Sequence, residues 1–163
     1  MQRFVITCVG AYSPVGCSWD EVEATLRAGK NRIRHMAEWD VYDGLNTRLG
    51  APVSNFEIPK HFTRKKTRSM GRLSLMATSA SENALIDAGL LDDPILTSGR
   101  VGVAYGSSSG STDAISDFGN MLINRTLDGI TATTYIRMMG HTAAVNIGVY
   151  FGLSGRIINS SVA

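Results

Sequence analysis

Three short apolar segments, separated by helix-like stretches, limit the folds open to this chain more than any other feature. They are FVITCVG (4–10), VGVAYG (101–106) and GRIINSSVA (155–163). Short runs of β-branched residues bounded by glycine are typical of strands, and runs without regular polar alternation are typical of strands covered on both faces. The sequence therefore predicts an α/β fold with largely buried strands.

Two helices are predicted before the second strand. Ser18 stands three residues before Glu21, which is the spacing of a capping box, so a helix is expected over 18–27 with Gly29 as its stop. A longer helix is expected over 67–88, ending at Gly89. Its apolar residues recur at three- and four-residue steps and are mostly alanine, so this helix should pack closely on a neighbour. They are Leu73, Met76, Ala77, Ala80, Ala84 and Ala88.

Two further helices are predicted between the second and third strands. One covers 113–124, and the other covers 135–151 and ends near Gly152. Strand or loop signals also occur around 47–53. With 163 residues, a single domain is the default expectation.

Composition and charge exclude several classes of protein. No run reaches eighteen apolar residues, so a transmembrane helix is not expected. The net charge is only +2, and the most basic segment, 60–72, has no interleaved aromatic beyond Phe62, which argues against nucleic acid as a partner. Cys8 and Cys17 have no metal-ligand spacing, so we interpret them as small packed residues of a protein from a reducing compartment, the cytoplasm.

Basic residues are concentrated between Lys60 and Arg72. This segment holds six of the sixteen basic residues of the chain and no acidic one. Such a run is either a solvated helix face or a docking patch for an acidic partner.

The segment Gly106-Ser107-Ser108-Ser109-Gly110 matches the G-x-S-x-G pattern of a hydrolase nucleophile elbow between a strand and a helix. Asp128 and His141 follow in the hydrolase order. However, the chain is short for such an enzyme, and His141 lies inside a predicted helix. A small serine hydrolase using Gly106, Ser108 and Gly110 is therefore a remote alternative.

The three histidines, His35, His61 and His141, have no second ligand at a metal-binding spacing, so no metal and no cofactor are predicted. Met138 and Met139 fit either core packing or the lining of an apolar ligand tunnel, because methionine fills irregular shapes.

Taken together, these segments resemble one family. The resemblance is carried by FVITCVGAYSPVG, RKKTRSMGRLSLMATSASENALIDAGL, RVGVAYGSSSG and MMGHTAAVNIGVYFGLSG, in this order along the whole chain. They are similar to segments of the β-ketoacyl-acyl-carrier-protein synthases, the condensing enzymes of fatty-acid and polyketide synthesis. The resemblance implies a thiolase-like fold, in which residues 1–163 form the N-terminal half-domain of a duplicated, layered α-β-α-β-α architecture.

The same resemblance implies where the chemistry lies. The strand resembling GRIINSSVA leads in this family into a nucleophilic cysteine, here at position 164, and two catalytic histidines lie in the C-terminal half. We therefore expect the polypeptide to continue past Ala163, and we expect none of the catalytic residues within 1–163. The implied reaction adds two carbons to a carrier-bound acyl chain by decarboxylative condensation with malonyl carrier protein.

Five residues are expected to contact substrate or partner on the same basis. Ser109, Met138 and Met139 are expected at the acyl pocket, the methionines across a dimer interface, and Lys65 and Arg68 are expected to dock acyl carrier protein. Ser109 departs from the family, which often has a bulky aliphatic residue or glycine there. A second departure is Asp128-Gly129, where relatives carry further basic docking residues.

The implied partners are the carrier protein, the C-terminal half of the same polypeptide and a second copy in a homodimer, with a heterodimer as the alternative. A non-catalytic partner subunit of the same fold, a chain-length factor, is the second interpretation. It would apply if position 164 were not cysteine.

Overall fold

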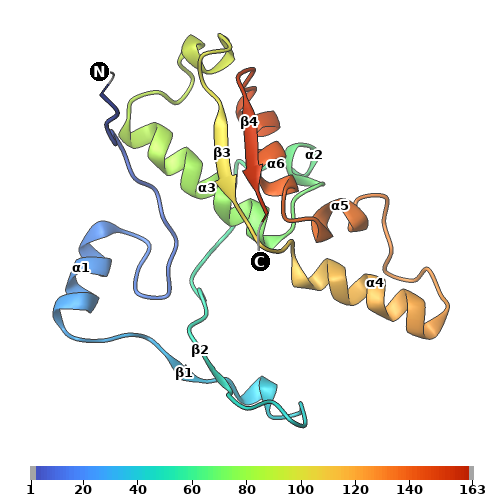
Figure 1. Ribbon diagram of the computed structural model, residues 1–163. Coiled ribbons are helices and arrows are strands. Elements are labelled where there is room, and N and C mark those ends of the chain that lie inside the picture. The colour runs from blue at the N-terminus through green and yellow to red at the C-terminus, as the bar shows by residue number, and fades with distance from the viewer. Residues whose placement is uncertain (1–2, 162–163) are drawn as a thin grey trace. The chain divides into compact units, whose positions relative to one another are not determined.

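A computed structural model describes residues 3–161 (Figure 1). The chain divides into two compact units, one formed by residues 11–57 and the other by the residues before and after that stretch. None of the helices among residues 3–161 is long and apolar enough to cross a membrane. The assignment of residues 1–163 to one half-domain stays a prediction.

The larger unit is built from two parallel strands and helices layered on them. β3 (Val103–Gly106) pairs with β4 (Ile157–Ser160), with Val103 opposite Ile157 and Gly106 opposite Ser160. α3 (Arg72–Asp87) and α6 (Thr142–Phe151) pack on each other, and α6 also contacts both strands. The α/β class is thereby confirmed.

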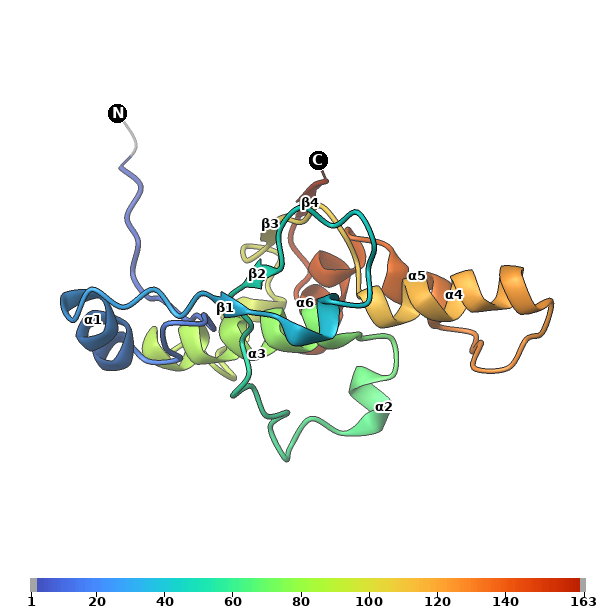
Figure 2. The same ribbon diagram turned by 90° about the horizontal axis from the view of Figure 1, so that it is seen from below.

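The remaining elements of this unit are short, apart from one helix. They are α2 (Arg64–Thr67), the 3-10 turn η2 (Pro94–Thr97), α4 (Thr112–Asn124) and α5 (Thr134–Met138). α4 and α5 lie side by side in both views of the molecule (Figures 1 and 2).

The helix-stop glycines are where the sequence placed them. Gly29 follows α1 (Trp19–Arg27) at φ 66° and Gly89 follows α3 at φ 67°, in the left-handed region where a side chain is disfavoured. The N–H of the next residue then bonds back to the last turn: Leu90 N–H donates to the Leu85 carbonyl at 2.8 Å. Gly152 ends α6 in the same way.

The interface between α3 and α6 is made of small side chains, but the buried face of α3 is not the predicted one. The alanine-rich stripe is only half-buried, and the buried residues of α3 are Ser74, Thr78, Ser79 and Glu82. The buried face differs because a hydroxyl group can be buried when its hydrogen bonds are completed, and Asn146 of α6 completes one by donating its amide N–H to the Ser74 hydroxyl. The alanine stripe does receive one close neighbour, since a Cβ on Gly10 would overlap the carbonyl of Ala80.

The segment 4–10 does not form the predicted buried strand. It has no strand assignment, and the side chains of Phe4 and Ile6 are 92% and 89% exposed. A strand needs a neighbour that completes its hydrogen bonds, and none of the described residues pairs with this segment as a strand. β3 and β4 are strands as predicted, but they are half-buried and largely exposed, respectively, so the expectation of largely buried strands is also wrong for this chain.

Two predicted helices are broken in the structure. The helix expected over 67–88 is interrupted between α2 and α3, where Gly71 is extended and packs against Ser111. The helix expected over 135–151 is interrupted between α5 and α6, where Met139 is extended at ψ 126°. Thr142 stabilises this second break, because its hydroxyl donates to the carbonyls of Ile136 and Met139 at 2.9 and 2.7 Å.

The smaller unit contains α1 (Trp19–Arg27), an antiparallel pair of two-residue strands, β1 (Arg34–His35) and β2 (Leu49–Gly50), and the 3-10 turn η1 (Ala37–Trp39). The predicted start of α1 is confirmed. The Ser18 hydroxyl accepts the N–H of Glu21 at 3.3 Å, and the Glu21 carboxylate accepts the N–H of Cys17 at 2.8 Å. Cys17 itself is half-buried.

Candidate active site

The carboxyl ends of β3 and β4 lie side by side and define the candidate site. Gly106 and Ser160 are opposite each other, and the N–H of Ser107 continues the ladder by donating to the Ser160 carbonyl at 3.0 Å. In α/β folds, ligands bind outside the carboxyl ends of parallel strands. The serine-rich turn 107–111 that follows β3 therefore begins beside the carboxyl end of β4.

This turn is fastened to the end of α5. The N–H of Gly110 donates to the Met138 carbonyl at 3.1 Å, and the N–H of Ser111 donates to the Arg137 carbonyl at 2.8 Å. A Cβ on Gly110 would overlap the carbonyls of both residues, so only glycine allows this approach. Gly140, in the break between α5 and α6, packs against the same turn.

The structure thus brings two of the three predicted acyl-pocket residues together through the backbone. Ser109 immediately precedes the glycine that bonds to Met138; Ser109 is exposed, Met138 is half-buried and Met139 is exposed. Whether they contact an acyl chain stays a prediction.

Lys65 and Arg68 belong to a different surface. Both are exposed, Lys65 on α2 and Arg68 at its end, and they line a cavity between α2, α5 and α6. The segment is held by Asn146 of α6, whose amide oxygen accepts from the Ser69 hydroxyl at 2.8 Å and whose amide nitrogen donates to Ser74 at 3.3 Å. Lys66 adds a cation–π contact, with its Nζ 5.0 Å from the Tyr150 ring centroid.

The hydrolase alternative receives no support from the geometry. Ser108 is exposed, and no hydrogen bond between described residues joins it to His141, which is the exposed N-cap of α6. Asp128 is also exposed, and its backbone N–H bonds to Thr126. A nucleophile without a base in hydrogen-bond reach lacks the arrangement that activates a serine.

One polar pair was not expected from the sequence. His61 Nε2 lies 2.9 Å from the carboxylate of Glu82, whose side chain is only 10% exposed in the middle of α3. Tyr150 is close by: burial raises the pKa of its hydroxyl above the usual value, and the Glu82 charge raises that pKa further. The signal in the sequence was an acidic residue, Glu82, in the middle of a helix of small residues, but nothing in the spacing of 61 and 82 indicated its partner.

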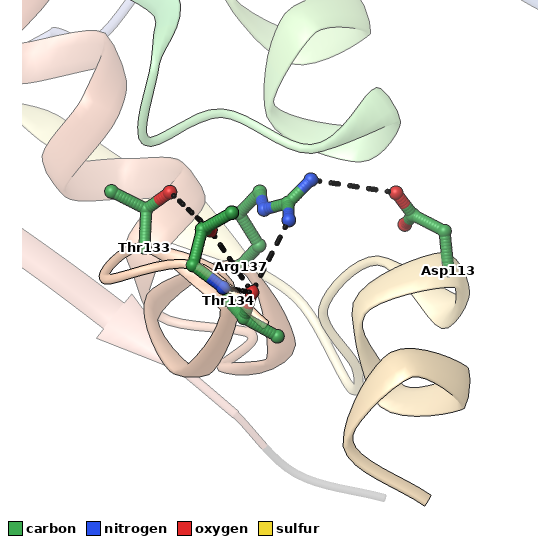
Figure 3. A network of polar contacts seen from close by, with 5 residues as sticks. Asp113, Thr133, Thr134 and Arg137 are labelled. Atoms are coloured by element: carbon green, nitrogen blue, oxygen red, sulfur yellow. Dashed lines mark hydrogen bonds and ion pairs between the residues drawn. The ribbon is translucent and has the colours of Figure 1, made fainter. Parts of the chain in front are cut away.

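Arg137 was also missed. Its backbone carbonyl holds the serine turn, while its side chain faces Asp113 of α4 and Thr134 of α5 (Figure 3). It therefore connects the candidate site with the cavity that holds Lys65 and Arg68.

The two parallel strands with helices layered on them, and the serine-rich turn at the strand ends, belong to an architecture shared with β-ketoacyl synthases of thiolase-like fold. Residues 1–162 match the family model described as Beta-ketoacyl synthase, N-terminal domain, so the chain belongs to the β-ketoacyl synthase family.

Similar proteins agree with this assignment. A crystal structure of a β-ketoacyl synthase from Burkholderia phymatum STM815 is 49% identical, with a TM-score of 0.92 over 99% of this chain and 40% of that one. Nodulation protein E of Rhizobium leguminosarum bv. trifolii is 30% identical over 99% of the chain and 40% of its own length. A 3-oxoacyl-[acyl-carrier-protein] synthase 2 of Synechocystis is 28% identical over 76% of the chain and 29% of its own length. The chain thus spans well under half the length of these relatives.

Proposed function

We propose that the protein containing this chain is a condensing enzyme, which extends a carrier-bound acyl chain by two carbons through decarboxylative Claisen condensation with malonyl carrier protein. The observation that carries the proposal is the family match over residues 1–162, supported by 49% identity to a β-ketoacyl synthase. A cytoplasmic homodimer that uses no cofactor is part of the proposal.

In this proposal the nucleophile is a cysteine directly after Ala163. A helix N-terminus lowers the pKa of a thiol, so the thiolate takes the acyl chain from its carrier as a thioester and the carrier thiol leaves. Malonyl carrier then loses carbon dioxide, its α-carbon attacks the thioester carbonyl, and the cysteine thiolate departs. Two histidines of the C-terminal half and backbone N–H groups stabilise the developing oxyanion.

Residues of this chain have supporting roles. The backbone-linked Ser109 and Met138, with Met139, are proposed to contact the acyl chain, and Ser109→Phe should cut activity selectively for longer acyl groups.

Lys65 and Arg68 are proposed to attract the acidic carrier protein, because charge complementarity mainly raises association rates. Changing both to glutamate should raise the KM for carrier-bound substrate and leave small thioester mimics unaffected, whereas equal losses with both substrates would refute docking.

Acylation provides the decisive test. The full-length protein is incubated with acyl carrier thioester, and its intact mass and peptides are measured. An adduct on a cysteine next to Ala163, followed by formation of a β-ketoacyl product with malonyl carrier, is the expected result. If an inert residue such as glutamine stands at that position, the protein is instead a non-catalytic partner subunit that resembles a chain-length factor. An adduct on Ser108 instead would favour the hydrolase.

A further inference from the structure

The cavity between α2, α5 and α6 concentrates positive charge. It has a volume of about 1050 Å³, and its cationic side chains come from two separate elements. Four belong to α2 and the residue after it, and the fifth lies on α5; they are Arg64, Lys65, Lys66, Arg68 and Arg137. No carboxylate is among the described residues that line it. A cluster of positive charges in a concave site raises the local concentration of anions.

Arg137 differs from the other four because it is largely buried. Its side chain is 19% exposed, and its Nε is buried without a hydrogen bond to any described residue. Its Nη1 lies 3.7 Å from the Asp113 carboxylate and its Nη2 lies 3.5 Å from the Thr134 hydroxyl (Figure 3). Both distances exceed the 2.7–2.9 Å of good charge-assisted hydrogen bonds, so the guanidinium is desolvated with its donors poorly satisfied.

Hydroxyl groups line the same wall. Thr131 and Thr133 border the cavity, and their hydroxyls lie 3.3 Å apart. Thr131 is held in place by Thr134, whose hydroxyl accepts the N–H of Thr131 at 2.9 Å. The hydroxyls of Thr131, Thr133 and Thr134 form a chain of two hydrogen bonds, which leaves one hydroxyl proton for an outside acceptor. A hydroxyl donor beside a guanidinium fork matches an anion with several oxygen acceptors around one centre.

We propose that this cavity binds a phosphate group, with Arg137 as its buried ligand and the α2 cations at its mouth. The planar fork of arginine bonds two phosphate oxygens at once, while lysine contributes charge without directionality. A carboxylate would use fewer of these donors. Phosphate binding here does not depend on the condensation proposed above. The cavity shares only the proposed docking residues, Lys65 and Arg68, with that proposal, and the proposed nucleophile and acyl-pocket residues do not line it.

The test is a titration of the full-length protein with inorganic phosphate at constant ionic strength, with chloride as the competing anion. Binding should be saturable and at least tenfold weaker in Arg137→Gln and in Arg137→Lys, because neither residue supplies the fork. Arg100→Gln is the matched control: it removes the same charge from an exposed arginine outside the cavity. Equal weakening in Arg100→Gln and Arg137→Gln, or the absence of saturation, would overturn the proposal.

A spectroscopic readout guards against misfolded variants. In the unaltered protein, the NMR signal of the Arg137 Nε–H should shift saturably with phosphate and not with chloride, while other arginine signals move little. An unmoved Arg137 signal at saturating phosphate excludes the site.

The source of the phosphate is then found by competition. Coenzyme A should displace inorganic phosphate if the site takes a free phosphate ester. A carrier protein bearing its phosphorylated prosthetic arm should compete better than the same carrier without the arm if the phosphate arrives on the carrier. Displacement by neither would contradict the assignment to a phosphate ester.

Discussion

α3 and α4 are the two longest helices of the larger unit, and they differ in which side chains are buried and which are exposed. α3 buries the polar residues Ser74, Thr78 and Glu82. α4 buries only Ala114 and exposes apolar residues, among them Leu122 at 62% and Ile123 at 80%. Each arrangement departs from the usual distribution of side chains in a helix of a globular protein.

The difference follows from the neighbours of each helix. The buried groups of α3 have partners on other segments, since Ser74 bonds to Asn146, Glu82 to His61, and the Thr78 hydroxyl contacts the Met70 sulfur at 3.8 Å. α4 contacts mainly α5, which is only five residues long. Polar burial is therefore tolerated where hydrogen bonds are completed, and apolar exposure persists where no element of the described chain covers the face.

The largest effect is expected where the residues that precede α3 and α4, Gly71 and Ser111, meet. A Cβ on Gly71 would collide with the side chain of Ser111, so Gly71→Val should cost about 3 kcal/mol of stability by overpacking. Urea denaturation of the full-length protein measures it.

Gly119→Ala is the control for that variant. A Cβ there meets nothing within 4 Å, so the substitution should raise stability by about 0.5–1 kcal/mol through helix propensity. Equal effects of the two substitutions would mean that the contact of Gly71 with Ser111 does not hold the helices.

The polar burial of α3 is tested at its partner on α6. Asn146→Ala removes the amide that bonds to the half-buried Ser69 and the buried Ser74 and leaves both without this partner, which should cost about 1–3 kcal/mol. The exposed Asn83 of α3 is the matched control, and Asn83→Ala should change the free energy of unfolding by less than about 0.5 kcal/mol. A neutral Asn146→Ala would show that the buried hydroxyls need no partner.

The charge on Glu82 should be visible in alkaline unfolding. The pKa of Tyr150 is raised in the folded state by burial and by Glu82, so the unfolded chain loses the phenol proton first. The stability linked to Tyr150 is complete below about pH 10 and is lost as the pH rises through the folded pKa. Tyr150→Phe should reduce this alkaline loss, as followed by urea midpoints at increasing pH.

Tyr105 provides the control for the role of Glu82. Burial alone raises the pKa of Tyr105, so Glu82→Gln should reduce the alkaline contribution of Tyr150 and leave that of Tyr105 unchanged. Identical alkaline profiles with and without the Glu82 charge would contradict the electrostatic effect of Glu82 on the pKa of Tyr150.

The smallest effect is expected on the exposed side of α4. Ile123→Ser should change the free energy of unfolding by less than about 0.5 kcal/mol, because little of this side chain is covered by the chain. If Ile123→Ser lowers the free energy of unfolding of the full-length protein by about 2 kcal/mol or more, another part of the protein covers α4. The apolar exposure that distinguishes α4 from α3 would then be absent from the full-length protein.

Features set by neighbouring residues in the sequence were correctly predicted. The start of α1 at Ser18 and the ends of helices at Gly29, Gly89 and Gly152 depend on hydrogen bonds within a few residues. The two strands at 101–106 and from 155 were recognised from composition over a similar span. The family was recognised because several such segments occur in a specific order.

Features that depend on distant residues were not predicted. The buried face of α3 is decided by Asn146 and His61, which lie 72 and 21 residues from their partners on that helix. The break before α6 and the position of Arg137 depend on the serine turn that packs against them. Strand formation at 4–10 needs a hydrogen-bonding neighbour in space. Only tertiary packing decides these features, because the free energy of burying a group depends on what covers it and which partner completes its hydrogen bonds.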